Sequence, residues 1–71
     1  MTIVRYDDPI HADGLVFTRL LVRSQTADRE VLGWRHCIGG FQIPVAVWKQ
    51  RLAEARAADA AREAGGGEND V

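Results

Sequence analysis

The large apolar side chains of this sequence are confined to its first three quarters, which limits where a core can form. Apart from the first and last residues, every hydrophobic residue larger than alanine lies between Ile3 and Leu52. The segment 53–64 is rich in alanine and offers only methyl groups for burial, and the segment 65–71 has neither core residues nor helix formers. We therefore expect one small domain over residues 1–64, with its core in 3–52, an alanine-rich helix end at 53–64 and a disordered tail at 65–71.

The size and charge of the chain exclude several classes of protein. A chain of 71 residues buries only about 60% of its unfolded surface, which leaves little room for an enclosed cleft. The net charge of −1 creates no global field toward nucleic acid or membrane. No apolar run approaches the roughly 18 residues of a membrane span, and no secretion signal is evident. We expect a cytoplasmic protein without a membrane partner; its eight arginines and one lysine are typical of a GC-rich, bacterial or phage-like genome.

Runs of β-branched and aromatic residues, separated by turn signals, predict a series of strands. Asp7-Asp8-Pro9 and Asp13-Gly14 are turn signals, and Gly39-Gly40 suits a type I′ hairpin, in which both central residues have positive φ. The predicted strands are Thr2–Tyr6, Leu15–Arg23, Val31–Ile38 and Phe41–Ile43.

One long helix is predicted after the strands. Pro44 suits the first helical position, where its missing N–H costs nothing. From Val45 to Ala64, the residues Val45, Trp48, Leu52 and Ala55 share one face, but this stripe turns polar at Asp59 and Arg62. At about 1.5 Å per residue, we expect the last two turns to project beyond the domain.

The resulting fold class is α+β, a small antiparallel β-meander of three or four strands followed by one long C-terminal helix. An all-α, three-helix fold is the alternative, because Asp13 and Thr26 could cap helices and the apolar residues between 15 and 22 do not separate the two periodicities. The β-branched character of that run favours strands.

The two central strands are expected to pair as a hairpin that is apolar on both faces. Our predicted register sets Leu21 opposite Leu32, Arg19 opposite Trp34 and Phe17 opposite His36. One face then carries Leu15, Phe17, Leu21, Leu32, Trp34 and Ile38, of which Phe17 and Trp34 are expected to pack against Trp48 and Leu52. The other face carries Val16, Leu20, Val22, Val31 and Cys37.

A single helix covers only one face of such a hairpin, so the other face needs another partner. We therefore expect a non-enzymatic interaction module without a cofactor, which forms a homodimer or docks on another protein. The expected interface residues are Val16, Leu20, Val22 and Val31.

The residues capable of metal binding or catalysis are few. His36 and Cys37 are adjacent and point to opposite faces of a strand, and His11 lies in another segment, so we expect no metal site and no catalytic cysteine. Asp7, Asp8 and Asp13 match no calcium-loop spacing and are interpreted as turn residues.

The alternative function is a small nucleic-acid-binding regulator. Basic side chains outnumber acidic ones in residues 19–56, whereas acidic ones dominate residues 1–14. A polar hairpin tip bordered by arginines can contact phosphates or enter a minor groove. The residues expected to make such contacts are Arg23, Gln25, Thr26, Arg29 and Arg35.

The fragment Ile38-Gly39-Gly40-Phe41-Gln42-Ile43-Pro44, followed by Trp48 and Leu52, resembles the end of excisionase-type winged helix domains. In that family a glycine hairpin leads into a last helix that bears a tryptophan. The resemblance covers residues 38–52 only. The family's helix-turn-helix has no counterpart here, so the resemblance implies no family membership and no site residues.

Overall fold

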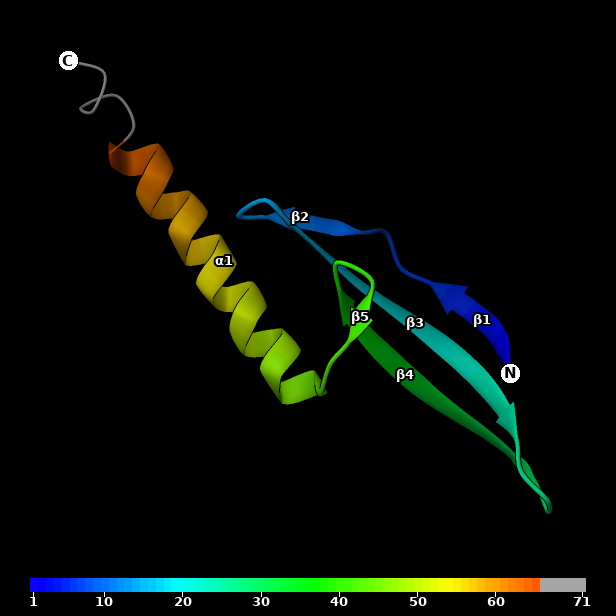
Figure 1. The fold of residues 1–71 in the computed structure, drawn as a ribbon. Coiled ribbons are helices and arrows are strands. Elements are labelled where there is room, and N and C mark those ends of the chain that lie inside the picture. The colour runs from blue at the N-terminus through cyan, green and yellow to red at the C-terminus, as the bar shows by residue number, and fades with distance from the viewer. Residues whose placement is uncertain (66–71) are drawn as a thin grey trace.

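The computed structural model describes residues 1–65 and shows an antiparallel sheet followed by one C-terminal helix (Figure 1). The predicted α+β meander is confirmed, and the three-helix alternative is wrong. The elements are β1 (Thr2–Tyr6), β2 (Ile10–Ala12), β3 (Leu15–Gln25), β4 (Glu30–Ile38), β5 (Phe41–Gln42) and α1 (Val45–Gly65).

The sheet is built around β3, and its strand order is β1-β3-β4-β5, with β2 also paired to β3. The three-residue strand β2 was not predicted. It lies between the two turn signals and pairs Ile10 with Phe17 and Ala12 with Leu15. β1 and β2 therefore occupy successive stretches of the same edge of β3, interrupted by the turn at residues 7–9.

The predicted register of the central hairpin is wrong by two residues. β3 pairs with β4 so that Leu21 lies opposite Trp34, Arg19 opposite His36 and Phe17 opposite Ile38. The reason is a short loop: the N–H of Thr26 donates to the carbonyl of Arg29 at 2.8 Å, and the Thr26 hydroxyl donates to the same oxygen at 2.7 Å. Because the shift is even, each side chain keeps its predicted face of the sheet.

The second hairpin turn agrees with the prediction. Ile38 pairs with Phe41, and Gly39 and Gly40 between them have φ values of 58° and 88°. Two consecutive positive φ values are the property of a type I′ turn that glycine provides without steric cost. This turn directs the chain through β5 to the start of α1.

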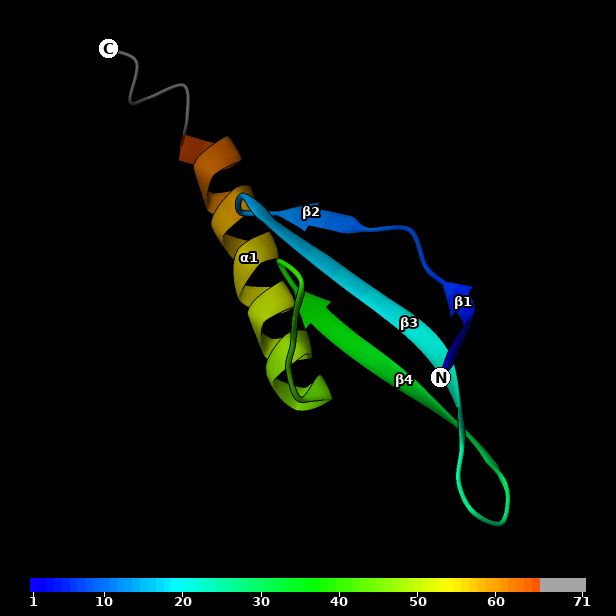
Figure 2. The same cartoon turned by 45° about the vertical axis from the view of Figure 1, so that its right-hand side comes forward.

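The core forms where α1 crosses the end of the sheet near β2 (Figure 2). Trp48 and Leu52 are buried against Phe17, whose ring lies edge-on to that of Trp48 with the centroids 5.9 Å apart. The Trp48 indole N–H donates to the carbonyl of Cys37 at 3.0 Å, which ties the helix to β4. Full burial of a side chain such as Phe17 contributes about 1.5–3 kcal/mol.

We predicted that the last two turns of α1 project beyond the domain, but Asp59 and Arg62 in these turns contact Asp13. The backbone N–H of Asp13 donates to a carboxylate oxygen of Asp59 at 3.0 Å, and Arg62 pairs with both aspartates. The polar end of the helix stripe therefore docks on the turn between β2 and β3. The helix ends at Gly65, one residue beyond the predicted limit, and the remainder of the predicted tail lies outside the described residues.

Candidate functional site

The helix covers only one end of the sheet (Figures 1 and 2). Apolar side chains beyond it stay exposed. On the helix side, the row of Phe17 and Ile38 lies under α1, whereas Trp34 is 39% exposed and Leu32 is 57% exposed. The prediction that Trp34 packs against Trp48 and Leu52 is therefore wrong. We call Leu21, Leu32 and Trp34, together on the helix side near the hairpin tip, the hairpin strip.

Arginines border the hairpin strip. The guanidinium of Arg19 lies over the Trp34 ring, 4.9 Å from its centroid, and Arg5 is paired in register with Leu21. Arg23 lies opposite Leu32 and forms an ion pair with Glu30 at 3.6 Å. This surface combines an apolar centre with a charged rim, which is the composition of many protein–protein interfaces.

The face of the sheet away from α1, which we call the open face, carries the predicted interface residues. Val31 is 41% exposed, and Val16 and Leu20 are half-buried. A bulge between Ile3 and Arg5 puts Ile3 opposite Val22 and Tyr6 opposite Leu20. In a regular strand Ile3 and Tyr6 would occupy opposite faces. They share the open face here because the bulge adds one residue to β1.

Val22 differs from the other predicted interface residues, because it is only 1% exposed. It lies between Ile3 on β1 and Gly33 on β4. The guanidinium of Arg35 reaches over Gly33, with Nη1 3.9 Å from the position that a Cβ would take. Val22 is therefore covered by its neighbours and offers no area to a partner. Ile3, Leu20 and Val31 offer the area that a partner can contact.

The predicted nucleic-acid contacts do not gather into one surface. Arg23 and Gln25 belong to the helix side of the hairpin, whereas Arg35 lies opposite Leu20 on the open face. The Thr26 hydroxyl holds the turn, donating to Arg29 O and accepting from Arg29 N. Arg29 is exposed at the tip itself. The four-residue loop thus divides these side chains between two faces and the loop.

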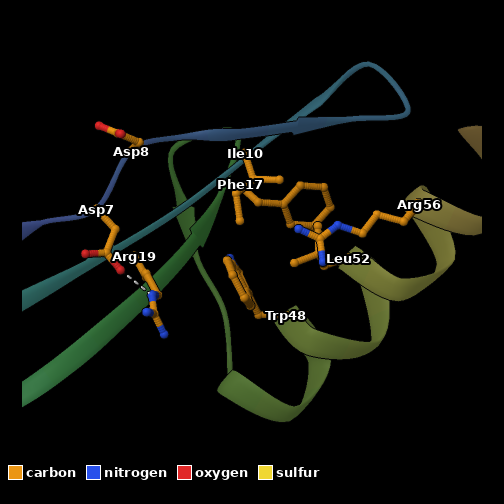
Figure 3. A pocket seen from close by; sticks show the side chains of 8 residues that line it. All are labelled: Asp7, Asp8, Ile10, Phe17, Arg19, Trp48, Leu52 and Arg56. Atoms are coloured by element: carbon orange, nitrogen blue, oxygen red, sulfur yellow. Dashed lines mark hydrogen bonds and ion pairs between the residues drawn. The ribbon is translucent and has the colours of Figure 1, made fainter.

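A hollow of about 280 Å³ lies between α1 and the start of the sheet. In Figure 3, Phe17, Trp48 and Leu52 form its apolar wall, while Asp7 and Arg19 pair at one side. The hydrogen bond from Arg19 lowers the pKa of the Asp7 carboxyl, and Arg5 adds to the effect. The residues lining the hollow are Asp7, Asp8, Ile10, Phe17, Arg19, Trp48, Leu52 and Arg56.

The lining of this hollow combines apolar side chains with charged ones. Its lining contains no serine, cysteine, threonine or histidine, and the Asp7 carboxylate is held by two arginines. A carboxylate whose pKa is lowered is a weak base. The size and lining of the hollow suit an apolar side chain that is bound next to charged groups.

The three residues considered for metal binding remain apart. His11 pairs with Val16 at the β2 edge, and Cys37 lies opposite Thr18 on the far side of β3. His36 faces the helix instead, with its ring 5.0 Å from that of Trp48. Within residues 1–65, no group of three or more His, Cys, Asp or Glu side chains is placed to hold a metal ion.

Comparison of the chain with protein-family models, with curated proteins and with solved structures finds no significant match. Among the described residues, no helix is both long enough and apolar enough to cross a membrane.

Proposed function

We propose that this protein is a non-enzymatic interaction module that associates with a second protein chain, its own copy or another. The observation that supports this most is the incomplete second layer of the fold. α1 covers one end of one face, and the hairpin strip and the open face keep large apolar side chains in solvent, including Leu32, Trp34 and Val31. Its one cysteine, Cys37, is free, which suits a reducing compartment such as the cytoplasm.

Association is favoured because it removes apolar surface from water, and this lowers the free energy. Burial of apolar surface contributes roughly 25 cal/mol per Å², and contiguous exposed patches above a few hundred Å² are unusual on monomers. Trp34 and Leu32 are adjacent along one face of β4, and Ile3 and Val31 lie on the other face of the sheet. A partner that covers either surface gains this free energy.

Light scattering at micromolar concentration, combined with pull-down from the native cell, tests the proposal. We expect a particle heavier than the 7.8 kDa chain, alone or with a bound protein. Leu20→Glu on the open face or Leu32→Glu on the hairpin strip should reduce this association, because each places a charge in an apolar surface. Ala57→Glu adds the same charge to the exposed side of α1 and should leave the association intact.

Leu52→Ala separates folding from association. Leu52 is 8% exposed in the core, so its truncation should lower stability by about 2–5 kcal/mol. Neither surface variant should lower stability to that extent. A monomeric protein that retains no partner, or retains the same partners after both surface substitutions, would refute the proposed function.

A further inference from the structure

β4 has an outer edge that is open over most of its length. β5 pairs with β4 only through Cys37 and Ile38, and the N–H of Ile43 donates to the carbonyl of His36 at 2.9 Å. From Glu30 to Trp34, the only neighbouring strand of β4 within residues 1–65 is β3. An open edge with large apolar side chains is a template for pairing with another chain.

The backbone groups on this edge can be assigned. The carbonyl of Arg29 accepts from Thr26 N, so Arg29 bonds toward β3. Every second residue after it, which includes Val31 and Gly33 on β4, bonds in the same direction. The His36 carbonyl bonds in the opposite direction, toward Ile43. Backbone groups alternate in direction along an antiparallel strand. The N–H and C=O of Leu32 and Trp34 therefore point outward, away from β3.

We infer that the occupant of this edge is a second copy of the chain, whose β4 pairs antiparallel to the first about a two-fold axis at Gly33. This inference rests on the proposed function and names its partner. It sets Leu32 of each copy opposite Trp34 of the other, so that each pair exchanges both of its N–H···O bonds. The two sheets then become one continuous sheet with both helices on the same side.

The side chains select this register over its neighbours. An axis at Val31 would set Leu32 against Glu30 of the second copy, and an axis at Leu32 would set Trp34 against Glu30. An axis at Trp34 would set Leu32 against His36, whose carbonyl already accepts from Ile43. Only the axis at Gly33 pairs the two exposed apolar residues of the hairpin strip with each other. Aromatic and aliphatic residues directly opposite each other stabilise a strand pair by about 0.2–1 kcal/mol.

The same arrangement brings other exposed apolar groups together. Antiparallel pairing sets the hairpin tip of one copy beside β5 and the start of α1 in the other. Phe41 of β5 is 77% exposed and Val45 at the start of α1 is 46% exposed. One two-fold operation thus pairs the open backbone edge and brings the hairpin tip of one copy beside these exposed side chains of the other.

The charges near the edge are complementary as well. Backbone pairing ends before His36, because its carbonyl already accepts from Ile43. There the hairpin tip of the second copy brings Glu30 close to His36. Burial lowers the pKa of His36, and the nearby positive charges of Arg19 and Lys49 lower it further. These two positive charges, and not His36 itself, favour a carboxylate at this place.

A cysteine at the axis provides a direct test. In a Cys37→Ser background, Gly33→Cys places the two thiols across a non-hydrogen-bonded pair, where the Cα atoms lie about 4.5 Å apart and a disulfide can form. An added Cβ meets only the Arg35 guanidinium, at 3.9 Å. Val31→Cys is the matched control, because its two copies would lie about 14 Å apart along the strands.

We expect Gly33→Cys to form a covalent dimer on mild oxidation, and Val31→Cys to remain uncross-linked. Cross-linking through Val31→Cys, or no cross-linking of Gly33→Cys, would overturn the inferred pairing. If the protein is nevertheless dimeric and loses its dimer with Leu20→Glu, the proposed function stands and the open face is its interface. A monomer in every assay overturns the inference.

A second pair of variants tests the edge without a new covalent bond. Leu32→Lys places a charge on the β4 edge, and Val4→Lys places the same charge on β1, at the opposite edge of the sheet, where the side chain is 45% exposed. Both residues are exposed, so neither change removes core packing. We expect Leu32→Lys to yield monomers and Val4→Lys to leave the dimer; the reverse result would refute pairing through the β4 edge.

Discussion

His36 lies on β4 at the boundary between the buried core and the exposed hairpin. It is 9% exposed, with the Trp48 ring on the helix side and Arg19 beside it in register on β3. Two residues along the strand, Trp34 is 39% exposed. His36 therefore marks the limit of the core, where a side chain that can gain a proton is already partly removed from water.

The pKa of His36 makes folding stability depend on pH. Burial, with Arg19 and Lys49, lowers this pKa below its ordinary value of 6.5. The unfolded chain then binds more protons than the folded one in this range, so the free energy of unfolding should fall as the pH decreases through 6.5. The Asp7 carboxyl, with its pKa lowered from 3.8, loses its contribution only at more acidic pH.

Urea unfolding at several pH values from about 7.5 to 5 measures this slope. His36→Phe keeps an aromatic ring against Trp48 and has no proton to gain, so the slope should become smaller in this variant. An unchanged slope would show that another group carries the pH dependence.

At the scale of elements, α1 is attached to the sheet at two separate places. Trp48 anchors its first half through Phe17 and the Cys37 carbonyl. Asp59 anchors its second half by accepting from the Asp13 backbone N–H. Asp13 has φ 50° and Gly14 has φ 72°, so this contact holds a turn whose backbone is itself unusual.

Asp59→Ala should loosen the second attachment. It removes the acceptor of a backbone hydrogen bond and the partner of Arg62, and because the site is partly exposed we expect a loss of about 0.5–1 kcal/mol. For a domain of this size, such a loss lowers Tm by a few degrees, about 2–8 °C.

Glu63→Ala is the matched control, because it removes an exposed carboxylate from the same part of α1. Thermal unfolding followed by circular dichroism should show a larger decrease in Tm for Asp59→Ala than for Glu63→Ala. Equal decreases would mean that charge on the helix, and not the contact with Asp13, determines the effect.

At the scale of the whole molecule, the fold is elongated. Its radius of gyration is 16.6 Å, whereas a compact domain of this length has about 11 Å. The hairpin and α1 extend in opposite directions from the small core around Phe17 (Figure 1). A shape of this kind buries little apolar surface within one chain, so association is expected to contribute a large part of the stability.

Thermal unfolding should therefore depend on protein concentration. If dimers form from folded chains, Tm should rise as the concentration is increased about a hundredfold, because mass action favours the associated state. Leu32→Lys should reduce this dependence. A Tm that is the same at all concentrations would indicate that one chain reaches its full stability alone.

The sequence by itself determined the features that depend on neighbours in the chain. β-branched runs predicted β1, β3 and β4, and Gly39-Gly40 predicted the type I′ turn, since glycine adopts positive φ values without steric cost. Pro44 predicted the helix start. The two faces of the hairpin were also predictable, because side chains alternate along a strand whatever its exact register.

Only the tertiary structure decided how these elements meet. The register depended on the hydrogen bonds of Thr26 and Arg29, which close a shorter loop than the polar sequence indicated. The bulge in β1 and the pairing of β2 depended on β3, their common partner. The part of the sheet that α1 covers depended on where β5 ends and α1 begins. For this reason Trp34 does not make its predicted contact with α1. Packing between distant segments sets all of these, and local sequence preferences do not contain that information.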